Sequence, residues 1–508
     1  RETSTEDENS NELNTRNREI QKKISTLKSK IEEKIPTYFK LTKIQIADID
    51  EVQNKLNENE ILLDYYFFEN DLKIILNSKN NFEIVSNGLN LNKINSIKDN
   101  IRQSVIPKNN KLAPYAVNAS LNFNNKTFQF FKSKLSSYKN IIIIPDGPLN
   151  SIPLHALATK SGKNCIDCRN IEFNLKFHNF NYYPSSDAFV SLDSISQDFK
   201  KKKFSISNKK VKNVASKTKD FIDDKTNIKP LKIVKDKMKK PLNIVKNKLK
   251  KNKESNTNVS NELYYLGIGD PDLYSKVANS NLDIKTKTTM LRSIFDTNNL
   301  NNTTLSEIYG PVEGSADEIK TVAEYLAPLK TKILLKENAN ESIIKNLDFT
   351  PYKIIHFATH GEISGAITGI NEPFLVLSPT EKTSNEDGIL TMSEIIMLDT
   401  NADLVILSAC NTASGDEIGS EGFSGLAKSF FMSGSKSILV SNWYVETNSA
   451  KEIVISIFKN IKENNNLTIS QSLNLTMRDM QSNKKNYSHP LFWAPFVLVG
   501  KNQSLTIH

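Results

Sequence analysis

Short aliphatic runs alternate with amphipathic helical stretches along most of this chain. The runs Ile141–Ile144 and Leu404–Leu407 are continuous and far shorter than the roughly 20 apolar residues that a membrane span needs. Continuous apolar runs of this length are typical of parallel strands that are buried on both faces. The sequence therefore predicts an α/β fold: a mostly parallel sheet with helices on both faces, whose functional residues gather beyond the carboxyl ends of the strands.

The predicted strands fall into two groups. We expect a first α/β unit over residues 57–192, a lysine-rich insertion over 193–260 and a second α/β unit over 261–508. Residues 1–56 are interpreted as a polar tail followed by helices. An amphipathic pattern at 18–34 predicts a helix that could end an upstream repeat array. The chain does not begin with Met, which is compatible with a longer protein.

The positive charge of the chain is concentrated in the insertion. The whole chain has a net charge of +10, but residues 200–253 contain 21 Lys and no Arg against 4 Asp, and the remaining residues are net negative. A tandem repeat beginning at Lys229, KPLKIVKDKMK followed by KPLNIVKNKLK, could form a basic amphipathic helix. The segment is either a solvated low-complexity insertion or a weak binding site for an acidic partner or an anionic membrane. Lysines without interleaved aromatic residues do not predict sequence-specific binding of nucleic acids.

Two reactive side chains directly follow two of the predicted strands. His360 ends the stretch KIIHFATH, and Cys410 ends the stretch LVILSAC 50 residues further along. About 50 residues also separate the catalytic His and Cys of caspases. Neighbouring parallel strands could present both side chains together, so that the imidazole takes the proton of the thiol and produces a nucleophilic thiolate. The backbone amides of Gly361 and Cys410 would then face the developing oxyanion. For either residue alone, the alternative is ordinary packing or a turn.

Two further motifs admit weaker interpretations. His356 and His360 have the HxxxH spacing that binds zinc on a helix, but this segment is predicted to be a strand. We therefore expect no metal here and expect His356 to point into the surroundings of the sheet. Cys165 and Cys168 form a single CxxC motif, which we interpret as two exposed loop cysteines. Half of a zinc site or a redox pair is the alternative.

Several blocks of the sequence together resemble one protein family. They are HFATHGEI from His356, DGILTMSEIIML from Asp387, DLVILSACNTASG from Asp403, EGFSGLAKSFFMSGSKSILVSNWYVE from Glu421 and HPLFWAPFVLVG from His489. In this order they resemble the CHAT-domain proteases, a caspase-like family that is related to separase and often follows tetratricopeptide repeats. The resemblance extends from about Pro36 to Gly500 and is interrupted by the lysine-rich insertion.

The resemblance implies a fold and an activity. It implies a cysteine endopeptidase that cleaves a specific protein partner, with His360 as general base and then acid and Cys410 as nucleophile. It also implies an N-terminal pseudo-caspase unit without catalytic residues, packed on an active C-terminal unit. Such a mechanism requires no metal or organic cofactor. Proteases that resemble this chain tend to be controlled by a regulatory protein or by an attached repeat domain.

The resemblance is weakest where the substrate groove is expected. The family often has the sequence WPVDD, whereas this chain has WYVET from Trp443. In caspase-like enzymes this neighbourhood holds the substrate peptide as an added strand. We expect Trp443 and Val445 to line the groove. Three acidic residues could select a basic P1 residue, or could be surface and helix-start charges: Glu446, Asp416 and Glu421.

The cysteine content bears on where the protein acts. Three Cys in 508 residues exclude a disulfide scaffold and favour a reducing compartment, so we expect a cytoplasmic protein. Two other functions compete with the protease. One is a catalytically silent caspase-fold scaffold that binds peptides in a signalling complex. The other is a binder of membranes or nucleic acids that acts through its lysines.

Overall fold

The computed structural model describes the chain in several stretches. They are residues 47–107, 111–192, 263–273, 309–362, 364, 370, 372–379, 387–408, 425–443 and 445–505. The predicted helix at 18–34 and the lysine-rich insertion lie outside these residues, and so do three predicted site residues: Cys410, Asp416 and Glu421. Below, the N-terminal half means the described residues up to 192, and the C-terminal half means those from 263 onward.

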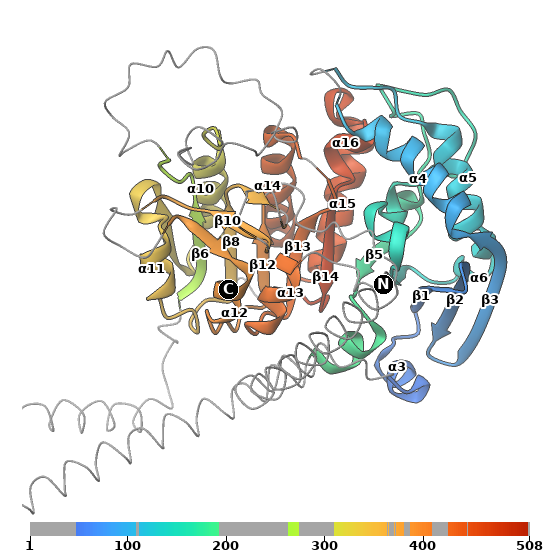
Figure 1. The fold of residues 1–508 in the computed structure, drawn as a ribbon, viewed down its shortest axis with the longest axis horizontal. Helices are drawn as coiled ribbons and strands as arrows, with labels where there is room; N and C mark the ends of the chain where they lie inside the picture. Colours follow the sequence, from blue (N-terminus) through green and yellow to red (C-terminus); the bar gives the residue numbers. More distant parts are fainter. Residues whose placement is uncertain are drawn as a thin grey trace, which may run out of the picture. The chain divides into compact units, whose positions relative to one another are not determined.

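Eleven strands form one sheet, in the spatial order β3-β2-β1-β4-β5-β14-β13-β12-β8-β6-β7 (Figure 1). Their bounds are β1 (Glu60–Phe68), β2 (Asp71–Ser78), β3 (Asn81–Asn90), β4 (Asn140–Ile144), β5 (Asn179–Tyr182), β6 (Leu263–Gly269), β7 (Lys330–Leu335), β8 (Ile354–Ala358), β12 (Leu404–Leu407), β13 (Ser437–Ser441) and β14 (Phe496–Gly500). Neighbouring strands are antiparallel in the pairs β1–β2, β2–β3 and β13–β14 and parallel in the other pairs. The predicted mostly parallel α/β fold is confirmed.

The apolar character of the central strands explains their position. Every residue of β8, β12, β13 and β14 is buried, as expected for strands that are covered on both faces. In β2, buried and half-buried residues alternate over the first half of the strand, as expected where one face of an antiparallel strand is solvated. The bounds predicted for β12, Leu404–Leu407, agree residue for residue with the structure.

Helices pack against the sheet. In the N-terminal half they are α3 (Ile49–Lys55), α4 (Leu91–Val105), α5 (Val117–Thr127) and α6 (Lys132–Leu135). In the C-terminal half they are α10 (Ser315–Leu326), α11 (Glu341–Lys345), α12 (Met392–Ile396), α13 (Gly425–Met432), α14 (Thr447–Glu463), α15 (Ile469–Asn483) and α16 (Pro490–Trp493). Within the described residues, none of the helices combines the length and the apolar character that crossing a bilayer demands.

Two glycines in β6 let helix α10 approach the sheet closely. A Cβ atom on Gly267 would lie 2.3 Å from Cγ2 of Ile319, and one on Gly269 would lie 2.5 Å from the carbonyl oxygen of Ala358. Both distances are too short for ordinary contact, so a larger residue at either position would push α10 or β8 away. Helix α10 therefore contacts both β6 and β8.

Strands β5 and β14 join the two halves of the sheet. They pair in parallel, with Val499 opposite Tyr182. The side-chain amide of Asn181 also donates a hydrogen bond to the carbonyl oxygen of Gly500 at 2.9 Å. One group of buried apolar residues in mutual contact extends through both halves. The hydrogen bonds and the core of a single sheet therefore connect segments that are about 300 residues apart in sequence.

The cysteines of the CxxC motif differ from the prediction of exposed loop cysteines. Cys165 and Cys168 are joined by a disulfide bond, and Cys168 is buried. The backbone N–H of Cys168 donates to the hydroxyl of Ser488 at 3.0 Å, so this loop packs against the residues that precede α16. Both sulfurs belong to the disulfide, and neither is then a thiolate that could hold a metal ion. The sequence showed the motif but not the long-range contact that buries it.

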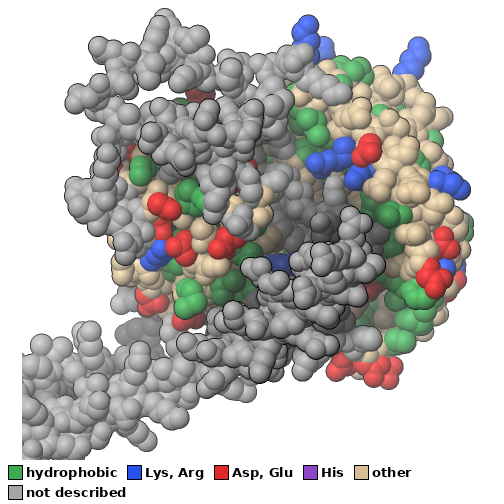
Figure 2. All heavy atoms as spheres, viewed as in Figure 1, with side chains coloured by type: hydrophobic (Ala, Val, Ile, Leu, Met, Phe, Trp, Pro, Cys, Tyr) green, Lys and Arg blue, Asp and Glu red, His purple; other side chains and the backbone are tan. Residues whose placement is uncertain are grey.

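The described surface carries charges of both signs. Figure 2 shows acidic and basic side chains distributed over one face, among apolar and other groups. Some form exposed ion pairs, such as Lys134 with Glu83 and Lys176 with Glu172. Pairs of this kind each contribute roughly 0–1 kcal/mol to stability, so the fold depends on its core rather than on them.

Candidate active site

His360 lies just beyond the carboxyl end of β8. The residue is 1% exposed, and its ring stacks on Tyr309, with 5.1 Å between the ring centroids and 29° between the planes. Its Nε2 atom lies 2.6 Å from the carbonyl oxygen of Gly310. Because a carbonyl oxygen can only accept a hydrogen bond, Nε2 carries the proton of the neutral ring, and Nδ1 is the basic nitrogen. The contact with Gly310 therefore selects the tautomer in which Nδ1 can take up a proton.

A second, three-stranded sheet holds the backbone around His360. It contains β9 (Gly361–Glu362), β10 (Phe374–Val376) and β11 (Ile389–Thr391), with β10 in the middle. Gly361 lies opposite Leu375 in this sheet. The N–H of Val376 donates to the carbonyl oxygen of His360 at 2.9 Å, and the Thr359 hydroxyl donates to the carbonyl oxygen of Val376. Gly361, the expected oxyanion donor, is therefore part of a strand whose backbone is fixed by β10.

The strand that precedes Cys410 lies beside β8. β12 pairs with β8 in parallel, with Leu407 opposite Phe357, and the N–H of Ser408 donates to the carbonyl oxygen of Phe357 at 2.9 Å. The carboxyl ends of the two strands therefore meet at one edge of the sheet. Cys410 follows Ser408 by two positions and lies outside the described residues. The structure thus describes the histidine of the predicted dyad and the strand that leads to the cysteine.

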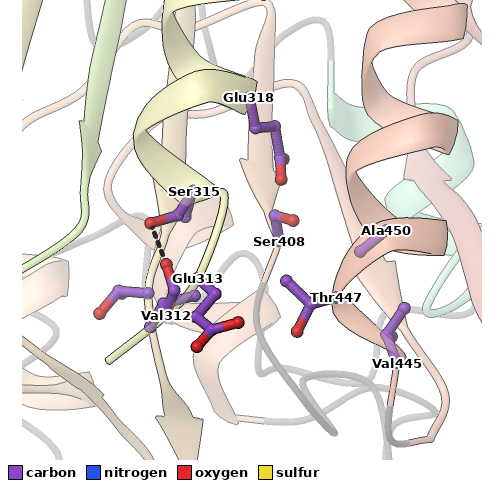
Figure 3. Close-up of a pocket in the computed structure, with 10 residues that line it drawn as sticks. Val312, Glu313, Ser315, Glu318, Ser408, Val445, Thr447 and Ala450 are labelled. Atoms are coloured by element: carbon purple, nitrogen blue, oxygen red, sulfur yellow. Dashed lines mark hydrogen bonds between the residues drawn. The ribbon is translucent and has the colours of Figure 1, made fainter. Parts of the chain in front are cut away.

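A small, partly open hollow lies beside these strand ends. Figure 3 shows Glu318 entering it from α10, Thr447 belonging to α14 on the opposite wall, and Ser408 between them. Glu313 and Val445 also line the hollow. Its lining therefore combines two acidic side chains with hydroxyl groups and apolar side chains.

A buried hydrogen-bond network lies behind the hollow. Nε2 of His356 lies 3.0 Å from a carboxylate oxygen of Glu318, and Nδ1 lies 2.9 Å from the hydroxyl of Tyr265. Burial and the charge of Glu318 raise the pKa of Tyr265 well above its ordinary range, so the phenol keeps its proton, and its hydroxyl also donates to the carbonyl oxygen of Ile319 at 3.5 Å. Because a carboxylate can only accept a hydrogen bond, Nε2 of His356 carries the proton that faces Glu318.

The two histidines of the HxxxH motif therefore have different partners. His356 contacts groups on β6 and α10, whereas His360 contacts the residues that precede α10. Across the stretches that the structure describes, no three His, Cys, Asp or Glu side chains form a group that could hold a metal ion.

The expected groove residues lie in three different settings. Val445 lines the hollow. Trp443 is only 3% exposed, and its indole N–H donates to the carbonyl oxygen of Leu491 at 3.4 Å, so the side chain is packed inside the protein. The Glu446 carboxylate accepts hydrogen bonds from the backbone N–H groups of Asn448 and Ser449 at 3.0 and 2.8 Å, and it therefore caps α14.

Sequence reasoning missed Tyr309, Gly310 and Glu318. The first two lie outside every predicted helix and strand, and no local pattern marks a carbonyl group that will face a histidine 50 residues later. Glu318 could have been predicted from the sequence, because it lies on the same buried stripe of α10 as Ile319 and Val322. An acidic residue on an apolar stripe predicts a buried partner.

Comparison with known proteins agrees with the sequence blocks. The model of the CHAT domain family matches residues 126–501. Tetratricopeptide repeat protein 28 of Mus musculus is 26% identical over 228 residues, which cover 39% of this chain and 9% of that protein. The Homo sapiens protein of the same name is 24% identical over 228 residues, with the same shares. This chain thus spans less than a tenth of the length of the curated relatives it matches.

Solved structures show a distant likeness. The Saccharomyces cerevisiae separase–securin complex aligns with a TM-score of 0.43 at 9% identity, covering 90% of this chain and 31% of the matched chain. The Arg-specific cysteine proteinase gingipain R aligns with a TM-score of 0.36 at 10% identity, covering 82% and 76%. The family assignment rests on the sequence match alone: since it extends over residues 126–501 of 508, this chain belongs to the CHAT domain family.

Proposed function

We propose that this chain is a cysteine endopeptidase that hydrolyses peptide bonds of a protein partner. The observation that carries the proposal is the orientation of His360. Gly310 holds the Nε2 proton, so Nδ1 is the basic atom at the edge where β8 and β12 end. In the proposed reaction, Nδ1 takes the proton of the Cys410 thiol and the thiolate attacks the scissile carbonyl carbon. The imidazolium then protonates the leaving amine, and water hydrolyses the thioester with His360 as base.

The surrounding backbone supports the charged states of this reaction. The carbonyl oxygen of Gly310 would stabilise the imidazolium, because it lies against the protonated Nε2. The backbone N–H groups of Gly361 and Cys410 are the proposed oxyanion donors. Pairing of Gly361 with β10 favours such a role, because a donor whose position is fixed needs no reorganisation during the reaction.

The hollow favours a substrate with a basic P1 side chain. Glu313 and Glu318 would attract a lysine or arginine head group, and Val445 would contact its aliphatic stem. In this assignment Glu313 and Glu318 select the basic P1 residue, in place of Glu446, whose carboxylate caps α14.

The proposed enzyme acts under the control of an attached repeat domain or a regulatory protein. The support for this proposal is that the matched relatives are named as tetratricopeptide repeat proteins and extend far beyond the matched region. The lysine-rich segment at 200–253 is a candidate for weak contacts with acidic partners or membranes.

Covalent labelling tests the proposed function. A peptidyl acyloxymethyl ketone with Arg at P1 is expected to modify Cys410 in the folded chain, and Cys410→Ala removes the labelling. His360→Ala should slow labelling about a hundredfold or more, because a general base contributes that order of rate. His360→Asn, which keeps a polar side chain in the same place, should be equally slow, and thermal unfolding shows whether both variants fold. The matching probe with Asp at P1 should react more slowly than the Arg probe.

The competing scaffold function predicts a different result. A catalytically silent chain would leave Cys410 unlabelled, or would label it at a rate that does not depend on His360. Cys165 and Cys168 should not react, because their sulfurs form a disulfide.

A further inference from the structure

An arginine of the N-terminal half reaches the segment that follows β13. Arg102 lies in the last turn of α4, and its Nη1 atom donates to the carbonyl oxygens of Ser151 at 3.2 Å and of Asn442 at 3.0 Å. The guanidinium carbon lies 6.0 Å from the ring centroid of Trp443, which is within the range of a cation–π contact. One side chain thus connects a helix and a loop of the N-terminal half to residues 340 positions later.

The contacted segment leads directly into one wall of the hollow. It connects β13 to α14, and Val445 within it lines the hollow. Two further hydrogen bonds come from the C-terminal half: the N–H of Asn442 donates to the carbonyl oxygen of Pro495 at 2.8 Å, and the indole of Trp443 donates to that of Leu491. The segment is therefore held from both halves of the molecule at the point where it leaves the sheet.

We propose that Arg102 is a positioning residue of the substrate groove: it holds Asn442 and Trp443 and thereby places Val445 in the wall of the hollow. The inference rests on the proposed function, because it gives the N-terminal half a role in binding the substrate at that site. A planar guanidinium suits this role, since it can serve two carbonyl oxygens and an aromatic face at once. A lysine ammonium keeps the charge but lacks this fork.

A second arginine provides a control that distinguishes positioning of the segment after β13 from a general stabilisation of the contact between the halves. Arg478 of α15 is also half-buried and also crosses between the halves, donating to the carbonyl oxygens of Leu175 at 2.7 Å and His178 at 2.8 Å. These acceptors precede β5 and do not belong to the segment after β13. If Arg102 acted only by joining the halves, the loss of Arg478 would affect the hollow in the same way.

Inactivation kinetics of the full chain with the Arg acyloxymethyl ketone test the proposal. KI reports on the groove, and the maximal inactivation rate reports on the His–Cys dyad. For Arg102→Ala we expect KI to rise about tenfold with the maximal rate within about twofold of wild type, because hydrogen bonds from a charged donor are lost. The KI of Arg102→Lys should lie between the values of the wild type and of Arg102→Ala. Arg478→Ala should lower the melting temperature and leave KI unchanged. An unchanged KI in Arg102→Ala, or an equal rise in both alanine variants, overturns the proposal.

Hydrogen–deuterium exchange gives a readout that does not depend on activity. The peptide spanning 441–449 should exchange faster in Arg102→Ala than in wild type and in Arg478→Ala. If the wild type does not react with the probe, the proposed function fails, and exchange alone then decides whether Arg102 holds the segment. Unaltered exchange in Arg102→Ala contradicts the positioning role whatever the labelling result.

Discussion

Each half of the molecule contains a carboxyl group that is largely withdrawn from water, and the two groups have opposite surroundings. In the N-terminal half, Asp64 of β1 accepts a hydrogen bond from the hydroxyl of Ser186 at 2.8 Å and lies near the carboxylate of Asp146. In the C-terminal half, Glu318 of α10 accepts from the imidazole of His356 at 3.0 Å and borders the hollow. Asp64 thus faces a like charge, whereas Glu318 faces a group that can donate a proton.

The two carboxyl groups therefore differ in their effect on stability. Burial raises the pKa of Asp64 from 3.8 to about 6; the hydrogen bond from Ser186 lowers it, and the charge of Asp146 raises it. Ionised Asp64 therefore costs stability. Glu318 instead joins the core network to the wall of the hollow. Removing the charge of Glu318 should therefore destabilise the C-terminal half, whereas removing the charge of Asp64 should stabilise the N-terminal half.

The largest expected effect is the loss of Glu318. Glu318→Ala leaves His356 buried without its acceptor, and we expect the free energy of unfolding to fall by about 3 kcal/mol. Denaturant unfolding measures this change. Asp317→Ala is the matched control, because Asp317 lies on the same helix and its side chain is 69% exposed, beside Lys451. We expect the control to change stability by less than about 1 kcal/mol. If Glu318→Ala and Asp317→Ala lost the same free energy of unfolding, a special role of Glu318 would be contradicted.

An effect of opposite sign and no larger size is expected at Asp64. Its pKa is higher in the folded chain than in the unfolded chain, so the folded state loses stability as the pH rises from about 3.8 to about 6. Asp64→Asn keeps an acceptor for Ser186 and removes the charge. We expect the variant to be more stable than wild type by about 3 kcal/mol above pH 6 and equally stable below pH 4.

Thermal unfolding at pH 7.5 and pH 4 measures the effect at Asp64. Asp99→Asn provides the control, since the Asp99 side chain is 62% exposed and its replacement should have little effect at either pH. A stabilisation by Asp64→Asn that persists at pH 4 would mean that the charge is not its cause.

The smallest effect is expected for the disulfide of the N-terminal half. Because Cys165 and Cys168 close a very short loop, their bond restricts the unfolded chain by about 2 kcal/mol or less. Dithiothreitol should lower the stability of the wild type by that amount and leave a Cys165→Ser, Cys168→Ser double variant unchanged. If dithiothreitol destabilised the double variant equally, the effect would arise elsewhere in the chain.

Local patterns predicted most of the fold. Aliphatic runs marked β4 and β12, and the stretch that leads to His360 was predicted to be a strand, as β8 is. The short strands β5, β9 and β11 were missed because they contain few residues and owe their conformation to their neighbours. The pairing of β5 with β14 could not be predicted either, since pairing between distant segments leaves no local signal.

The candidate site shows the same limit. The position of His360 after a strand was visible in the sequence, but the contacts that orient it were not, because Tyr309 and Gly310 lie in no recognisable element. Trp443 was expected to line an open groove, as an aromatic residue in that family block would. Its burial beneath Arg102 depends on a contact between the halves that only the folded chain reveals.

The central place of β14 has a consequence for synthesis. β14 follows every other strand of the 11-stranded sheet in the chain, yet it lies between β5 and β13. As the ribosome adds about 5–20 residues per second, the edge of β5 waits some tens of seconds for its neighbour. During that interval the growing polypeptide exposes an open strand edge, which is a site for aggregation or for a chaperone. The nascent chain also cannot complete its sheet, and so cannot acquire its mature architecture, before residues 496–500 leave the ribosome.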